Sequence, residues 1–130
     1  MTNAEVIGCF ENGTPPGEEF HHAEHIRVGF AYICEFPIVE ALEKFSSALR
    51  RLAVKSGRSH LYNETITWAY LFLIRERITL GGGNVSWAEF VEQNPDLLAW
   101  KPGILSRYYR EETLQSDLSK TMFVMPDKHQ

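Results

Sequence analysis

The stretch LYNETITWAYLFLIRERITL, residues Leu61–Leu80, decides the fold of this chain. No charged residue occurs between Glu64 and Arg75. At about 100° per residue, the apolar side chains of this segment point in nearly every direction around a helix. Such a helix spans a membrane or lies at the centre of a bundle. The uncharged run is much shorter than the roughly 20 residues that cross a bilayer, so we predict a central helix over about 61–80.

The segments on either side of this stretch have the patterns of further helices. Pro37 suits the first turn of a helix over 38–56, which carries an apolar stripe that includes Leu42 and Leu49. Ser86 and Glu89 have the spacing of a capping box, which indicates a helix over 86–93. Further helices are expected over 20–36, 97–100, 104–109 and 111–122, followed by an extended end at 123–126. The predicted fold is therefore all-α, an irregular helical bundle around the central helix.

The length and the turn-forming residues predict one domain. A chain of 130 residues is long enough for one hydrophobic core and too short for two. Residues 1–19 contain Asn12-Gly13-Thr14-Pro15-Pro16-Gly17, a composition that interrupts helices and strands. We therefore expect a flexible N-terminal arm over 1–19, a single helical domain over 20–126 and a tail over 127–130.

Charge and cysteine content exclude several classes of partner. The net charge of −4 leaves no basic surplus for nucleic acid or an anionic membrane, so neither is expected as a partner. The two cysteines, Cys9 and Cys34, form no disulfide framework, and Cys34 is expected to be a buried free thiol. A reducing cytoplasm is the expected compartment.

Three histidines at the start of the first long helix are the main candidates for function. In His21-His22-Ala23-Glu24-His25, helical geometry places His22 and His25 on the side opposite Glu24. Gly29 lies on the same side as these two histidines and would let another helix approach closely. We therefore predict a pocket at His22 and His25 near the start of the central helix.

The favoured function is binding, with or without turnover, of a small molecule in this His- and Glu-lined pocket. In an enzyme, His25 would be the general acid or base, because its ordinary pKa lies near neutrality, and Glu64 would orient it or bind a cation. The expected ligand-binding residues carry an imidazole, indole or phenol group: His22, Tyr62, Trp68 and Tyr108.

Three other interpretations stay open. His21, His25 and Glu64 could hold a metal ion, since two histidines four residues apart share a helix face. The histidines could instead be hydrogen-bonded structural residues at a helix start. The chain could also be a non-catalytic interaction module, with a homodimer formed through Trp87 and Trp100. No motif identifies a cofactor, a substrate or a reaction.

Three segments show a resemblance to a known group of proteins. They are FHHAEHIRV at 20–28, YNETITWAY at 62–70 and RYYREETL at 107–114. They resemble segments of a family of small, uncharacterised bacterial helical proteins, and the resemblance covers most of residues 20–126. It implies a helical domain and a bacterial source, but no activity. That family often has a histidine at the position of Asn63, so a site that needs this histidine would be altered here.

Overall fold

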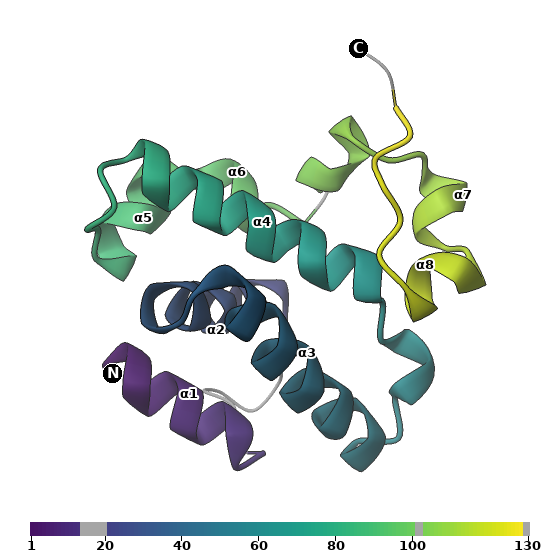
Figure 1. Cartoon of the computed structure of the whole chain (residues 1–130), viewed down its shortest axis with the longest axis horizontal. Coiled ribbons are helices and arrows are strands. Elements are labelled where there is room, and N and C mark those ends of the chain that lie inside the picture. Colours follow the sequence, from purple (N-terminus) through teal and green to yellow (C-terminus); the bar gives the residue numbers. More distant parts are fainter. Residues whose placement is uncertain (14–20, 101–102, 129–130) are drawn as a thin grey trace.

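The computed structural model describes residues 1–13, 21–100 and 103–128 and shows an all-α fold (Figure 1). No strand occurs among these residues. The eight α-helices are α1 (Asn3–Glu11), α2 (His22–Glu35), α3 (Ile38–Lys55), α4 (Glu64–Leu80), α5 (Trp87–Gln93), α6 (Pro95–Leu98), α7 (Glu111–Leu114) and α8 (Asp117–Thr121). Two 3-10 turns, η1 (Ser59–Leu61) and η2 (Ile104–Arg107), connect them. The predicted fold class is confirmed.

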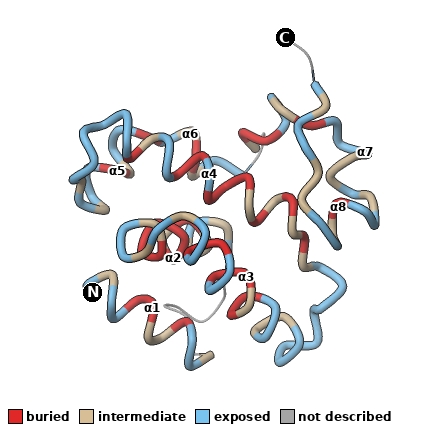
Figure 2. Tube along the Cα trace, viewed as in Figure 1, coloured by how far each residue is buried: buried red, intermediate tan, exposed pale blue. Residues whose placement is uncertain are grey.

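Helix α2 is the most enclosed element of the bundle. It packs against α1, α3, α4 and α6, and Figure 1 shows it between α1 and α4. Five consecutive residues, 28–32, are buried, so this part of α2 has neighbours on every side. The buried positions in Figure 2 accordingly follow α2 and the sides of α3 and α4 that face it. We predicted this enclosed, central position for α4.

Helix α4 is central to the bundle but has one exposed side, which corrects the prediction of an enclosed helix. Tyr70, Leu71 and Ile74 face the core, whereas Phe72 is 40% exposed and Arg75 faces solvent. Helices α2, α3 and α8 pack against α4, and apolar residues of α5, α6 and η2 share a core cluster with it. The helix begins at Glu64, after Asn63, whose side-chain oxygen accepts a hydrogen bond from the Ile66 amide at 2.9 Å.

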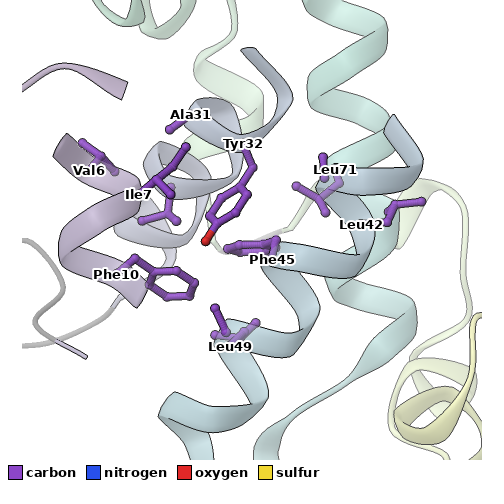
Figure 3. Packing of buried hydrophobic residues seen from close by; sticks show 12 residues of the cluster. Val6, Ile7, Phe10, Ala31, Tyr32, Leu42, Phe45, Leu49 and Leu71 are labelled. Atoms are coloured by element: carbon purple, nitrogen blue, oxygen red, sulfur yellow. The ribbon is translucent and has the colours of Figure 1, made fainter. Parts of the chain in front are cut away.

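The prediction of a flexible N-terminal arm is wrong for residues 3–11, which form α1 and pack on the domain. Thr2 and Glu5 form a capping box at its start, and Val6 and Phe10 are only 1% exposed. Figure 3 shows the ring of Phe10 near Tyr32 and Phe45, in the cluster that joins α1, α2 and α3. Apolar residues on one face of α1 therefore hold it in place. The rest of the predicted arm, 14–20, lies outside the described residues.

The C-terminal part contains shorter helices than predicted. The helix expected over 111–122 is two short helices, because Ser116 caps α8 by accepting a hydrogen bond from the Ser119 amide at 3.1 Å. The extended segment that follows crosses the start of α4, where the Thr65 hydroxyl donates to the Met122 carbonyl at 2.8 Å.

The predicted tail at 127–130 is anchored at its first residue. The Asp127 carboxylate accepts a hydrogen bond from the Arg110 amide at 3.0 Å, and the Asp127 amide donates to the Tyr108 carbonyl at 3.1 Å. Residues 129–130 lie outside the described part of the chain. The helical domain therefore extends past the predicted boundary at 126.

Cys34 is exposed, which corrects the expectation of a buried thiol. It lies near the end of α2, beside the exposed Glu35. Within the described ranges, none of the helices is both long and apolar enough to span a membrane.

Candidate functional site

A cavity of about 710 Å³ lies between the first turns of α2, the end of α3, η1 and the first half of α4. Most of its described wall is apolar, with side chains from three helices: Ile26, Phe45, Leu49, Leu52, Ala53, Ile66, Leu71 and Ile74. The histidines at the start of α2 add polar groups to the wall. Gly29 has no side chain here, and a Cβ atom at this position would lie 3.2 Å from the ends of Leu71 and Ile74.

His22 joins the cavity wall to α6. Its Nε2 atom lies 2.9 Å from the Leu97 carbonyl oxygen, and because a carbonyl only accepts, this nitrogen carries the proton. The imidazole ring also contacts the rings of Tyr70 and Trp100, each at 5.0 Å between centroids. Burial lowers the pKa of His22, and the hydrogen bond to Leu97 partly opposes this effect.

His25 lies one turn further along α2 and is more strongly affected by burial. Burial, together with the nearby His22, lowers the pKa of His25 to about 4. The imidazole is therefore uncharged at neutral pH, with one nitrogen that donates and one that accepts. The wall of the cavity thus has a polar but uncharged ring at this position.

Two tyrosines of the wall differ in what their hydroxyl groups contact. Burial raises the pKa of Tyr70 to about 12, and its hydroxyl makes no hydrogen bond with any described residue. The Tyr62 hydroxyl donates to the carboxylate of Glu64. Burial and this hydrogen bond raise the pKa of Tyr62 to about 12. Both phenols are protonated at neutral pH, and of the two only Tyr70 has a donor that no described residue uses.

The structure brings together only part of the predicted site. His22, His25 and Tyr62 line the cavity, but Glu64 does not. Its carboxylate lies 3.8 Å from Arg50 Nη1, beside the Tyr62 hydroxyl. Arg50 belongs to α3, so this contact directs the Glu64 carboxylate towards α3. The predicted catalytic pair of His25 and Glu64 is therefore not assembled.

Two other predicted ligand-binding residues have structural contacts instead. The Trp68 indole nitrogen donates to the Ser46 hydroxyl at 2.9 Å, and its ring stacks on Phe123 at 6.0 Å. Tyr108 directly follows η2 and packs against a second cluster of buried residues, which includes Ile104 and Tyr109. Neither of the two residues belongs to the described wall of the cavity.

The predicted metal ligands are also separated. His21 and His25 border the cavity, whereas Glu64 is held beside Arg50 and Tyr62. Across the described ranges, no three His, Cys, Asp or Glu side chains are placed to hold a metal ion. The geometry therefore gives no support to a metal site at these three residues.

The tryptophans considered for an exposed interface have different surroundings. Trp87 is half-buried against Phe30 and Phe90, at 5.3 and 6.0 Å between ring centroids. Trp100 is 58% exposed and lies at the edge of the cavity beside His22. They therefore do not form one aromatic surface.

Several residues of the described wall were not among the predicted site residues, including Tyr70, Trp100, Lys55 and Arg58. Tyr70 lies four residues after Ile66 and one turn before Ile74, so helical spacing could have placed it on the same face. Lys55 is the last residue of α3 and Arg58 follows the helix, where a basic residue is expected from the helix dipole alone. No local sequence pattern indicates that Trp100 borders the cavity, because its position depends on how α6 packs against α2.

Comparisons with known proteins do not assign this cavity. No protein-family model, curated protein or solved structure matches the chain. The function has to be inferred from the chemistry of the cavity wall.

Proposed function

We propose that this protein binds a small molecule with a mostly apolar body in the cavity between α2, α3 and α4. The observation that carries the proposal is the cavity itself, which has a volume of about 710 Å³ and a largely hydrophobic wall. Ligand sites in proteins are typically clefts of roughly 300–1,000 Å³ with apolar walls and a few polar groups. Both the size and the composition of this cavity fall within that description.

The polar groups of the wall would orient the ligand. The Tyr70 hydroxyl can donate to a carbonyl, ether or hydroxyl oxygen, and no described residue uses this donor. His25 adds an uncharged imidazole one turn after His22. Since burying an unpaired polar group costs free energy, a ligand that supplies a partner for Tyr70 would be favoured over one that does not.

Binding is better supported than turnover. A pKa of about 4 makes His25 a weak base at neutral pH, whereas an efficient general base has a pKa near the working pH. The carboxylate that would orient it, Glu64, is hydrogen-bonded to Tyr62 and lies beside Arg50. The two groups expected to share the chemistry therefore have separate surroundings.

The test is to fill the cavity and measure binding of a neutral apolar probe. N-phenyl-1-naphthylamine, whose fluorescence rises in apolar surroundings, should bind the wild-type protein at a single saturable site. Ala53→Phe places an aromatic ring in the cavity and should weaken this binding by about tenfold or more. The matched control is Val54→Phe, which adds the same ring to the neighbouring residue of α3, 67% exposed and outside the described wall.

The control should keep wild-type affinity, and circular dichroism melts of both variants should show a cooperative transition. Absence of saturable binding to the wild-type protein would overturn the proposal. Unchanged affinity in a folded Ala53→Phe variant would also overturn it, because the probe would then bind elsewhere.

A further inference from the structure

We infer that the ligand of this cavity is an organic acid, with its apolar body inside and its carboxylate at the rim beside Lys55 and Arg58. This inference rests on the proposed function and adds the charge and the orientation of the ligand. It comes from the distribution of ionisable groups around the cavity.

The described wall of the cavity contains basic groups and no acidic ones. Lys55, Arg58 and three histidines border it, and no Asp or Glu among the described residues does. This differs from the chain as a whole, in which 17 acidic residues outnumber 13 Lys and Arg. Lys55 and Arg58 place two positive charges at the rim of a protein whose net charge is negative, and these favour an anionic ligand over a cationic one.

The two rim cations are available to a ligand. Neither Lys55 nor Arg58 makes an ion pair with a described carboxylate, whereas Arg50 lies beside Glu64 and Arg77 binds Asp96. Both side chains are exposed, so they can reorient towards a bound group. An incoming carboxylate would therefore not have to displace an existing described ion pair.

The backbone at this end of α3 does not oppose an anion as strongly as a bare helix end would. The last carbonyl groups of α3 already accept hydrogen bonds from the amides of Ser56, Gly57 and Arg58, the last at 2.7 Å to the Ala53 carbonyl. The Ser56 hydroxyl donates to the Leu52 carbonyl at 2.8 Å. These bonds reduce the partial negative charge that would otherwise face the ligand.

The side of the cavity formed by α2 decides the orientation of the acid. His22 and His25 both have lowered pKa values, so this side offers neutral rings at pH 7 instead of cations. A carboxylate placed among Ile26, Leu71 and Ile74 would lose its hydration without gaining a charged partner, which is strongly unfavourable. At the rim the same group keeps its water and meets Lys55 and Arg58.

The test compares nonanoate with nonan-1-ol by isothermal titration calorimetry at pH 7.5 and low salt. The two probes have the same chain length and differ in the charge of the head group. Nonanoate should bind the wild-type protein about tenfold more tightly than the alcohol, as expected for two ion pairs at a partly exposed rim. This preference should fall as the salt concentration rises.

A double variant, Lys55→Gln with Arg58→Gln, should lose the preference for the acid and bind nonan-1-ol within about twofold of wild type. The charge-matched control is Lys44→Gln with Arg75→Gln, two exposed cations outside the described wall of the cavity. This control changes the net charge equally and should keep the preference.

The outcomes separate this inference from the proposed function. Binding of the alcohol and of N-phenyl-1-naphthylamine without a preference for the acid would overturn the inference and leave the proposed function standing. A preference that survives in the rim variant, or disappears in the control, would overturn it as well. If neither probe nor N-phenyl-1-naphthylamine binds, the proposed function itself fails.

Discussion

The two halves of α2 have opposite surroundings. The first half, which includes His22, His25 and Gly29, borders the cavity. The second half is closed by aromatic packing: the ring of Phe30 lies 4.9 Å from Phe90, and that of Tyr32 lies 5.5 Å from Phe45. Large rings fill the space around the second half, whereas the first half borders the cavity and includes Gly29, which has no side chain to fill it.

The same difference appears in the hydroxyl groups of two tyrosines. The Tyr32 hydroxyl, in the packed half, donates to the Glu11 carboxylate at 3.0 Å. The Tyr70 hydroxyl, on the cavity wall, has no hydrogen-bond partner among the described residues. A packed region satisfies its own polar groups, and a binding site leaves one for its ligand. We expect stability to depend mainly on the second half of α2 and binding on the first.

The largest expected effect on stability comes from the packed half. Phe10→Ala removes a ring that is 1% exposed and contacts Tyr32 and Phe45, so the free energy of unfolding should fall by about 3–5 kcal/mol. Urea denaturation would measure this change. Val39→Ala, at a residue 73% exposed, serves as the control and should change stability by less than about 0.5 kcal/mol. A loss below about 1 kcal/mol for Phe10→Ala would show that α1 is not part of the cooperative core.

The first half of α2, which borders the cavity and is called the cavity half below, should make the free energy of unfolding depend on pH. The pKa of His25 is about 4 in the folded protein and near 6.5 when unfolded, so the unfolded state binds more protons between these values. Stability from this group is complete above pH 6.5 and decreases as the pH falls towards 4. The decrease attributable to His25 should reach roughly 3 kcal/mol, measured by urea denaturation across this range.

His25→Gln should remove most of that dependence, because glutamine does not titrate. His60→Gln is the matched control, since His60 is exposed and its removal should leave the pH profile unchanged. Parallel profiles for the wild-type protein and His25→Gln would show that His25 is not held neutral by burial. The difference between the two halves of α2 would then be one of packing alone.

Two helix caps lie outside both halves of α2. Removing either one should have a smaller effect on the free energy of unfolding, and the two effects should be equal. Thr2 and Ser86 each form a capping box, at the starts of α1 and α5. Thr2→Ala and Ser86→Ala should each lower the free energy of unfolding by about 0.5–2 kcal/mol, and neither should change probe binding. Thermal melts and titrations with N-phenyl-1-naphthylamine would measure both. Weaker binding in Ser86→Ala would show that α5 contributes to the cavity through α2.

These two caps illustrate which parts of the fold could be predicted. Ser86 and Glu89 were recognised as a helix start, and α5 begins where predicted. Thr2 and Glu5 have the same spacing before Val6 and Phe10, but the Gly- and Pro-rich stretch that follows suggested a flexible arm. Local signals of this kind are sufficient to locate helices. They do not say whether a short helix finds an apolar surface on which to pack.

The candidate site was predictable only where its residues lie on one helix. The 3.6-residue period placed His22 and His25 on one side of α2, and both line the cavity. Glu64 was joined to them because it lies at the start of α4, but its direction around α4 turns it towards Arg50. Trp100 reaches the cavity only through the packing of α6 on α2. Contacts between helices depend on rotations and crossing angles that the sequence does not state.

The smallest expected effect on the free energy of unfolding comes from adding one methyl group in the cavity half of α2. In Gly29→Ala, the new methyl group would lie 3.2 Å from the ends of Leu71 and Ile74. Both side chains border the cavity and can rotate into it, and alanine gains about 1 kcal/mol in helix propensity over glycine. The free energy of unfolding should therefore change by less than about 1 kcal/mol. Probe binding should weaken, because the displaced side chains occupy part of the cavity.

Ala31→Val is the matched insertion in the packed half. Ala31 is completely buried in the cluster with Val6 and Tyr32, so its neighbours have no open space to enter. Overpacking should lower the free energy of unfolding by about 1–3 kcal/mol, while binding of the probe stays within about twofold of wild type. Equal losses of stability at the two positions would contradict the comparison, because they would show that the side chains around Gly29 are as tightly held as those around Ala31.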